Sequence, residues 1–238
     1  MKIKVITSYK PGCWEQYAKK GIEAMAEHLP KEIDLVVYAE EQKPNCHYER
    51  IQWIDLNNAE PELVKFKTRH KDDPVANGKL GNVEGGVRRL PELQKLGGLD
   101  KNKESFLWDA VRFANKVFCV INGVRNSADY DYVVWLDADT NIFRPMPLNF
   151  LTGLLPQDTM VTYLGRENPS LNDGGKYPEC GFVGYNLKHP EIQNFISEWE
   201  KLYTDDTVFK ILEWHDSYVF WHLSKKFRSR SEERRVGK

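Results

Sequence analysis

The sequence has no long apolar run, no excess of one charge and no dinucleotide-binding glycine motif. None of its apolar stretches approaches the roughly 18 residues of a membrane-spanning helix, so we expect no transmembrane segment. The formal net charge of −1 at pH 7 gives no electrostatic reason to expect nucleic acid or a membrane surface as a partner. No Gly-x-Gly-x-x-Gly follows the first predicted strand, which argues against a dinucleotide site of that type.

Cysteine is also scarce, and its spacing is uninformative. The four cysteines form no CxxC pair and no pattern typical of a disulfide or zinc framework; they are Cys13, Cys46, Cys119 and Cys180. We therefore expect reduced thiols and a cytoplasmic protein. The start of the chain has too short an apolar run for a signal peptide and is typical of a first strand.

What the sequence does contain is enough apolar residue for a large core. The chain has 238 residues, of which 41% are hydrophobic, and this predicts one large domain or one domain with an appendage. A strand at 2–9, a helix at 14–29 and a strand at 33–38 form a β-α-β opening. Such an opening predicts an α/β fold with an open, mostly parallel sheet flanked by helices.

The remaining periodic segments continue this pattern. We expect strands at 51–56, 132–136, 159–164 and 178–186, and helices at 60–69, 106–122 and 190–203, with Ser105 capping the second of these helices. A last helix begins at Asp216 or Ser217. Residues 71–103 are polar and glycine-rich, which fits either an excursion over the active site or a solvated insertion.

The most informative stretch is Asp131-Tyr-Val-Val-Trp-Leu-Asp-Ala-Asp-Thr140. Its apolar part, 132–136, has the composition of a central strand buried on both faces. The strand leads into Asp137 and Asp139, and the carboxyl ends of strands in open α/β sheets are where ligands bind. Two carboxylates there suit Mg²⁺ or Mn²⁺ bridging to the phosphates of a substrate. The alternative is that both are solvated residues at the start of a loop.

Polar residues elsewhere are candidates for the same site. The hydroxyls of Thr7, Ser8 and Tyr9 end the first strand, where they would face a base and ribose or form an ordinary polar strand end. Arg112 and Lys116 are spaced i, i+4 and share one helical face, which suits either a diphosphate or solvent.

Three further candidates come from the second half of the chain. Gly181 interrupts a predicted strand, and glycine within a strand often marks close approach by a ligand or another backbone. Glu179, two residues earlier, is either a site carboxylate or an edge-strand residue. Asp216 is either a helix cap or a reactive carboxylate aimed into the cleft. His215 and His222 have the character of local packing residues.

Residues 228–238 differ from the rest of the chain, because seven of the eleven are charged and no apolar period is present. They resemble translated vector sequence, so we assign residues 1–227 to the domain and expect the natural protein to continue past about residue 227.

Together, the β-α-β start, the strand ending in Trp-Leu-Asp-Ala-Asp, the strand Gly-Phe-Val-Gly-Tyr-Asn and the helix entered through Trp-His-Asp-Ser resemble a nucleotide-sugar glycosyltransferase of the GT-A fold. The resemblance covers about residues 1–225 and is specific only near 131–145, 178–187 and 213–220. It implies a single GT-A-like domain with a Rossmann-like nucleotide-binding half and an acceptor-side half. It further implies a hexosyltransferase that uses a UDP- or GDP-sugar and passes the sugar to a glycan, lipid or protein.

The resemblance also implies roles for individual residues. Asp139 would ligate Mn²⁺ or Mg²⁺, and Asp137 would share the metal or hold the ribose. The first strand end would face the nucleoside, Arg112 or Lys116 the phosphates, and the Gly181 strand the sugar. Asp216 would be the catalytic carboxylate, with Glu179 as a second candidate. Many retaining members have a further histidine ligand near the carboxyl end, and we expect that region to be missing or replaced here.

Three other interpretations stay open. A haloacid-dehalogenase-like phosphatase also has Asp-x-Asp after an apolar strand, but it normally carries Thr or Val where this chain has Asn141. A nucleotidyltransferase shares the fold type and the metal but transfers a nucleotidyl group. A catalytically inactive sugar- or nucleotide-binding relic is the non-enzymatic alternative.

Overall fold

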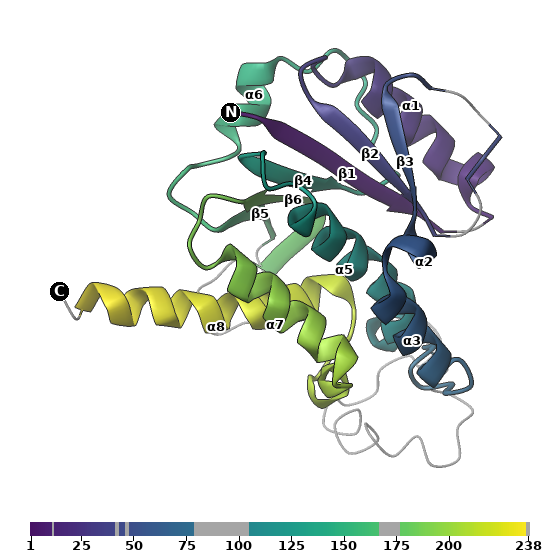
Figure 1. Ribbon diagram of the computed structural model, residues 1–238, viewed down its shortest axis with the longest axis vertical. Coiled ribbons are helices and arrows are strands. Elements are labelled where there is room, and N and C mark those ends of the chain that lie inside the picture. The colour runs from purple at the N-terminus through teal and green to yellow at the C-terminus, as the bar shows by residue number, and fades with distance from the viewer. Residues whose placement is uncertain (11, 41–42, 46–47, 79–104, 167–176, 237–238) are drawn as a thin grey trace.

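The chain folds around one six-stranded mixed sheet with helices on both faces (Figure 1). The computed structural model describes residues 1–10, 12–40, 43–45, 48–78, 105–166 and 177–236. The strand order is β3-β2-β1-β4-β6-β5. Strands β3, β2, β1 and β4 run parallel to one another, whereas β6 is antiparallel to both β4 and β5. The predicted fold class, α/β with an open and mostly parallel sheet, is confirmed.

The strands agree closely with the apolar runs of the sequence. Their bounds are β1 Ile3–Tyr9, β2 Asp34–Ala39, β3 Ile51–Asp55, β4 Tyr132–Leu136, β5 Val161–Arg166 and β6 Tyr177–Asn186. The helical elements are η1 Trp14–Ala18, α1 Lys19–His28, α2 Leu56–Ala59, α3 Pro61–His70, η3 Ser105–Trp108, α5 Ala110–Arg125, α6 Leu148–Gly153, α7 Ile192–Thr204, η4 Thr207–Lys210 and α8 Asp216–Val236.

The order of the strands creates a switch point beside β1. The chain adds β2 and then β3 on one side of β1, and it returns through α5 to place β4 on the other side. Helices that leave neighbouring strands in opposite directions open a crevice at the carboxyl ends of those strands, and ligands of open α/β sheets bind there. The ends of β1 and β4, followed by Lys10 and Asp137, lie at this crevice.

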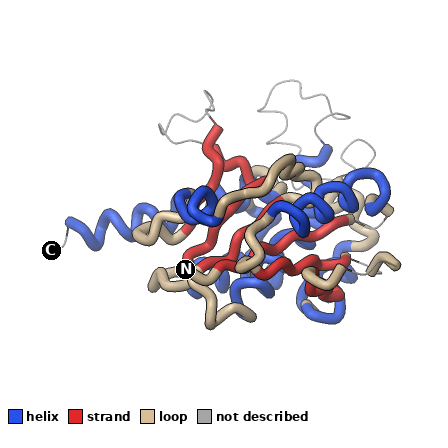
Figure 2. Tube along the Cα trace, turned by 90° about the horizontal axis from the view of Figure 1, so that it is seen from above, coloured by secondary structure: helices blue, strands red, loops and turns tan. Residues whose placement is uncertain are grey.

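The sheet separates two apolar layers, because successive strand residues point to opposite faces. On one face, Ile6, Val133 and Trp135 pack with the buried sides of α3, α5, α7 and α8. On the other, Val5 and Val134 pack with α1 and α6. Every residue of β4 is buried, as expected for a central strand. Figure 2 shows the strands running between the helices in this layered arrangement.

The structure corrects one predicted helix start and extends another helix. Helix α5 begins at Ala110 and not at 106, because Asp109 caps it by accepting a hydrogen bond from the Arg112 amide at 3.1 Å. Ser105 lies in the preceding 3-10 turn instead. The backbone of α8 continues as a helix to Val236, beyond the expected domain end at residue 227.

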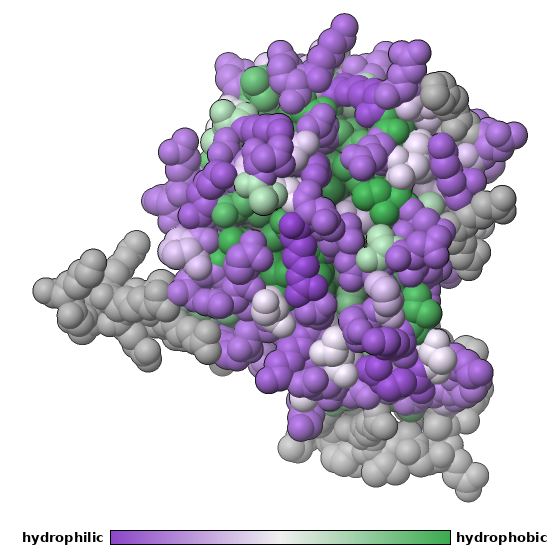
Figure 3. Space-filling view, in the orientation of Figure 1, coloured by the Kyte–Doolittle hydropathy of each residue, from purple (hydrophilic) through white to green (hydrophobic). Residues whose placement is uncertain are grey.

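Other predictions fall on parts of the chain that the structure leaves out. Most of the irregular region 71–103 and of the loop 165–177 lies outside the described residues. Among the residues that are described, no helix combines the length and the apolar character needed to cross a bilayer. The face shown in Figure 3 is mostly hydrophilic, with smaller hydrophobic areas between the polar side chains.

Candidate active site

A polar cleft lies at the switch point of the sheet and has two lobes. The Asp lobe, about 270 Å³, is bordered by the ends of β1 and β4 and by the first turns of α5 and α8; its lining includes Ser8, Tyr17, Lys116, Trp135, Asp137, Asp139 and Asp216. The α3–α5 lobe, about 710 Å³, adjoins it between the end of α3 and the start of α5. Lys10, Glu40 and Arg112 line both lobes, so the lobes are continuous.

The loop that carries the two aspartates is fixed by its backbone. The Asp137 amide donates to the Gly181 carbonyl at 2.9 Å, and the Thr140 amide donates to the Asp137 carbonyl at 2.9 Å. Helix α1 lies directly against this loop, because a Cβ added at Gly21 would lie 1.9 Å from the Ala138 carbonyl oxygen. Only glycine allows that approach, so Gly21 helps to set where Asp137 and Asp139 stand.

Lys116 is the centre of the Asp lobe. Its ammonium donates to Asp137 Oδ1 at 2.9 Å and to the Cys180 carbonyl at 2.7 Å, and it lies 2.6 Å from Asp216 Oδ2. Burial alone would lower the pKa of Lys116, but the carboxylates of Asp216 and Asp137 raise it above its usual value. Three acceptors match the three protons of an ammonium group, so all hydrogen-bond donors of the Lys116 cation are satisfied near neutral pH.

Trp135 adds a neutral donor to the same carboxylate. Its indole Nε1 donates to Asp137 Oδ1 at 2.6 Å, and the Lys116 ammonium stands 5.0 Å from the centre of its ring. Trp135 and Asp137 are two residues apart at the end of β4, so their side chains point to the same face of the sheet. The Oδ1 oxygen of Asp137 thus receives two hydrogen bonds, which leaves Oδ2 as the oxygen available to a ligand.

Asp216 begins α8 and is held as a carboxylate. Burial would raise its pKa, but the Lys116 ammonium and His215 outweigh burial and hold the pKa of Asp216 well below its usual range. His215 is itself buried; its Nε2 lies 2.9 Å from Glu213 Oε2 and its Nδ1 lies 3.9 Å from Asp216 Oδ1. Burial lowers the pKa of His215, but Asp216 and Glu213 raise it to above the usual value. His215 therefore contacts the site as well as packing locally.

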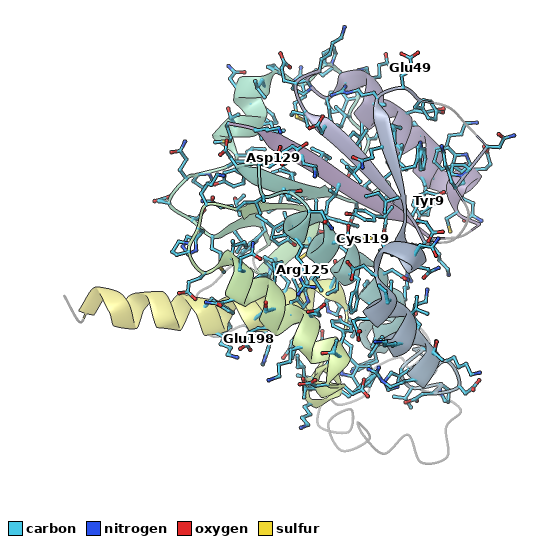
Figure 4. All side chains as sticks on the ribbon, viewed as in Figure 1. Tyr9, Glu49, Cys119, Arg125, Asp129 and Glu198 are labelled. Atoms are coloured by element: carbon cyan, nitrogen blue, oxygen red, sulfur yellow. The ribbon has the colours of Figure 1, made fainter. Side chains whose placement is uncertain are left out.

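Ser8 reaches the cleft, but its two neighbours do not. The Ser8 hydroxyl donates to Glu40 Oε1 at 3.0 Å, and both residues line the Asp lobe. Strand alternation turns Thr7 and Tyr9 to the opposite face, and neither is among the described residues that line a lobe. Thr7 is fully buried, and Tyr9, labelled at the end of β1 in Figure 4, packs against Trp14.

The cationic pair on α5 is brought to the cleft, with different roles for its members. Both Arg112 and Lys116 line the Asp lobe, as their i, i+4 spacing predicts. The Lys116 ammonium interacts with the carboxylates of Asp137 and Asp216 and with the Cys180 carbonyl. The guanidinium of Arg112 makes no hydrogen bond or ion pair with any residue that the structure describes, and Arg112 is exposed. Of this pair, Arg112 is therefore the cation with donors to offer an anionic ligand.

The two glycines of β6 serve different purposes. A Cβ at Gly181 would lie 3.4 Å from Asp137 Oδ2 and 3.6 Å from Glu179 Oε1, so this glycine leaves space next to Asp137 Oδ2. A Cβ at Gly184 would lie 2.5 Å from a Leu155 methyl group, so this glycine allows close packing of β6 against Leu155. Glu179 is near Asp137 by this measure, although it is not among the described residues that line the Asp lobe.

Asp137 and Asp139 have hard carboxylate oxygens that suit a divalent cation, and the part of the chain that the structure describes holds no group of three metal-ligating side chains. Asp139 is exposed and forms no hydrogen bond or ion pair with a described residue. Mg²⁺ usually binds through one or two carboxylates together with substrate phosphates and water. The two aspartates fit an ion of that kind, and they do not fit an ion enclosed by protein ligands alone.

Sequence pattern does not identify several residues of the site, and three of these carry a signal that could have found them. The apolar pattern predicts only a core role for Trp135, although its position two residues before Asp137 places both side chains on one face. Glu40 follows β2 directly, and an acidic residue at the end of a strand next to β1 was a detectable signal. Gly21 lies within a helix, where glycine costs about 1 kcal/mol relative to alanine and therefore indicates a close contact.

Comparisons with known proteins find distant likenesses to solved structures. The apo WbbM bifunctional glycosyltransferase matches at TM-score 0.46 and 12% identity, over 90% of this chain and 38% of that one. The mannosyltransferase Ktr4p from S. cerevisiae matches at 0.45 and 11%, over 92% and 64%. The galactosyltransferase LgtC, in complex with donor and acceptor sugar analogs, matches at 0.39 and 16%, over 85% and 65%.

These structures are described as glycosyltransferases, the class that the sequence resembles. This chain spans less than two thirds of the length of each of the three. No family model matches the chain, and no curated protein matches it. With TM-scores below 0.5 and identities of 11% to 16%, the structural likenesses carry no argument about the reaction. The chemistry has to be inferred from the residues of the cleft.

Proposed function

We propose that this chain transfers a sugar from a nucleotide-diphosphate sugar to an acceptor, with the help of Mg²⁺ or Mn²⁺. The observation that carries the proposal is the Asp lobe itself. It is lined by Asp137, by the exposed carboxylate of Asp139 and by Arg112, whose guanidinium forms no hydrogen bond or ion pair with a described residue. Two carboxylates for a metal and one cation for phosphate are what a diphosphate leaving group requires.

In this proposal Asp137 Oδ2 and Asp139 hold the metal. When bound, the ion supplies Lewis-acid neutralisation of the charge that develops on the leaving diphosphate. Arg112 offers its planar set of donors to the same phosphates, since guanidinium groups bind phosphate oxygens in pairs. The continuous cleft leaves the α3–α5 lobe for the nucleoside and the Gly181 side for the sugar.

Asp216 and Lys116 set the charge around the transferred sugar. A general base works best with a pKa near the working pH, and the ion pair with Lys116 holds the pKa of Asp216 well below that. Asp216 is therefore better suited to stabilise positive charge at the sugar than to take a proton from an acceptor. Glu179, close to Asp137 and Gly181, stays a candidate for the proton transfer.

Calorimetric titration with UDP and GDP, with and without Mn²⁺, tests the donor site. We expect metal-dependent binding of one of the two nucleotides, and its loss in Asp139→Ala with an unchanged melting temperature. Asp158→Ala is the matched control, because Asp158 is an exposed aspartate outside the residues that line the cleft. Undiminished Mn²⁺-dependent affinity in Asp139→Ala would show that the metal does not use this loop.

The product identifies the reaction. Release of a nucleoside diphosphate from a nucleotide sugar indicates sugar transfer, whereas release of pyrophosphate from a nucleoside triphosphate indicates a nucleotidyltransferase. Binding without either product would leave the chain as an inactive nucleotide-binding protein, and that outcome would overturn the proposal.

A further inference from the structure

The α3–α5 lobe is larger than the Asp lobe and has a polar lining of its own. It lies between the last turn of α3 and the first turns of α5, and it opens into the Asp lobe past Lys10, Glu40 and Arg112. A volume of about 710 Å³ is in the range of small-molecule sites. A ligand whose phosphates lie on the Asp lobe therefore has room for its nucleoside in this adjoining space.

Glu40 stands at the boundary between the two lobes and is unusually buried for a carboxylate. Only 9% of the residue is exposed. The Ser8 hydroxyl donates to its Oε1 at 3.0 Å, and no side chain or amide that the structure describes donates to Oε2. Burial raises the pKa of Glu40 above its usual value, although Ser8, Lys67 and Arg112 oppose the rise. A desolvated carboxylate oxygen with spare capacity gains strongly from a ligand that donates hydrogen bonds.

The other polar groups of the lobe define what kind of ligand edge fits. Asn115 is occupied, because its amide nitrogen donates to the Arg112 carbonyl at 3.2 Å and its oxygen accepts from Lys67 at 3.3 Å. Asp109 accepts from the Arg112 amide through Oδ1, and no residue that the structure describes donates to its Oδ2. The lobe thus offers carboxylate acceptors and cationic donors; the carboxylates are Glu40, Asp72 and Asp109, and the cations are Lys10, Lys67, Lys71 and Arg112.

We propose, on the basis of the function proposed above, that the α3–α5 lobe binds the base of the donor and that this base is guanine, held by Glu40. Guanine has two adjacent donor groups, N1–H and the N2 amine, which together match a carboxylate. Its opposite edge carries O6 and N7, the acceptors that Arg and Lys side chains bind in pairs. Uracil has a single N–H between two carbonyl oxygens, which a carboxylate repels.

Calorimetry on the wild-type chain with Mn²⁺ tests the base with GDP, IDP and UDP. IDP keeps N1–H and lacks only the N2 amine, so it isolates one hydrogen bond to the carboxylate. We expect GDP to bind about tenfold or more tightly than IDP, because a hydrogen bond to a charged group is lost, and we expect UDP to bind more weakly than GDP. UDP binding as tightly as GDP would overturn the guanine assignment while leaving the proposed function intact. Failure of all three to bind would overturn both.

Glu40→Gln tests the residue. Glutamine replaces one of the two acceptor oxygens with an amide NH₂ donor. We therefore expect the GDP affinity to fall and the ratio of the GDP and IDP affinities to approach one. Glu62→Gln, at a carboxylate on α3 that pairs with Lys65 and lines neither lobe, is the control and should keep the wild-type ratio. Equal weakening of GDP, IDP and UDP in Glu40→Gln would place Glu40 on another part of the nucleotide and overturn the base contact. The comparison of nucleotides on the wild type stands even if this variant does not fold.

Discussion

Replacing Gly21 with alanine tests whether helix α1 positions the aspartate loop. The added Cβ would lie 1.9 Å from the Ala138 carbonyl oxygen, 3.0 Å from its carbonyl carbon and 3.2 Å from the Thr140 carbonyl oxygen. All three are backbone atoms, so no side-chain rotation relieves the contact. To reach even 3.0 Å, the helix and the loop must separate by roughly 1.1 Å, and such overpacking costs about 1–3 kcal/mol.

The loss of folding stability in Gly21→Ala is partly offset, whereas the displacement of the aspartate loop is not. Alanine is favoured over glycine within a helix by up to about 1 kcal/mol, so the net loss of stability is about 0–2 kcal/mol. For a chain of this size that corresponds to a fall in melting temperature of less than about 8 °C. A displacement of roughly 1 Å at a reacting centre reduces activity by as much as about 100-fold. The variant should thus lose function far out of proportion to its stability.

The assay is a Mn²⁺ titration in the presence of the nucleotide that binds, followed by thermal unfolding of the same sample. We expect the metal-dependent affinity of Gly21→Ala to fall by about 10- to 100-fold. Two glycines serve as controls: a Cβ at Gly153 meets no atom within 4 Å, and one at Gly123 would lie 2.8 Å from the Ile6 Cδ1 atom, a movable side chain. Both should keep wild-type affinity. A Gly21→Ala chain that is folded and binds metal and nucleotide normally would refute the positioning role.

Two further substitutions test charges inside the molecule. Lys116→Met removes the ammonium group that pairs with the buried Asp216 carboxylate and leaves His215, 3.9 Å away, beside it. The substitution should reduce the free energy of unfolding by about 3–5 kcal/mol in urea at pH 7. Lys226→Met, which breaks the exposed pair with Glu198, should cost less than about 1 kcal/mol. Because the folded pKa of Asp216 is depressed, its contribution should be lost as the pH falls below the unfolded aspartate value of about 3.9, and a loss confined to alkaline pH would contradict this assignment. Burial raises the pKa of Glu60, so ionisation of this carboxyl group costs stability as the pH rises. The increase in the free energy of unfolding caused by Glu60→Gln should therefore be larger at pH 8 than at pH 4. An equal change at both pH values would show that Glu60 titrates normally.

Local sequence pattern was enough to predict the framework of the fold. The apolar run 132–136 is buried throughout, because only a strand covered on both faces accommodates such residues without interruption. The β-α-β opening likewise gave a parallel β1–β2 pair, since a helical crossover returns the chain in the same direction. The positions of Asp137 and Asp139 at the end of that strand, and of Arg112 and Lys116 on one helical face, follow from the same short-range periodicity.

Short-range pattern failed where two local signals competed. Ser105 and Asp109 are both good helix caps, and only the tertiary structure decides that Asp109 holds the first turn of α5. Thr7, Ser8 and Tyr9 are equally polar in the sequence. Which of them reaches the cleft depends on which face of β1 is covered by α5, and that places Ser8 alone in the lining of the Asp lobe.

The sequence by itself determined the strands and longer helices of this protein and the two aspartates at the end of β4, because periodicity and strand composition act over a few residues. The tertiary structure alone decided how distant charges pair. Lys116, Asp137 and Asp216 come from three different elements, and their distances of 2.6 and 2.9 Å depend on how α5, β4 and α8 pack together. The same is true of Glu40 beside Ser8 and of Gly21 against Ala138, because contacts between residues far apart in the chain leave no periodic signal in it.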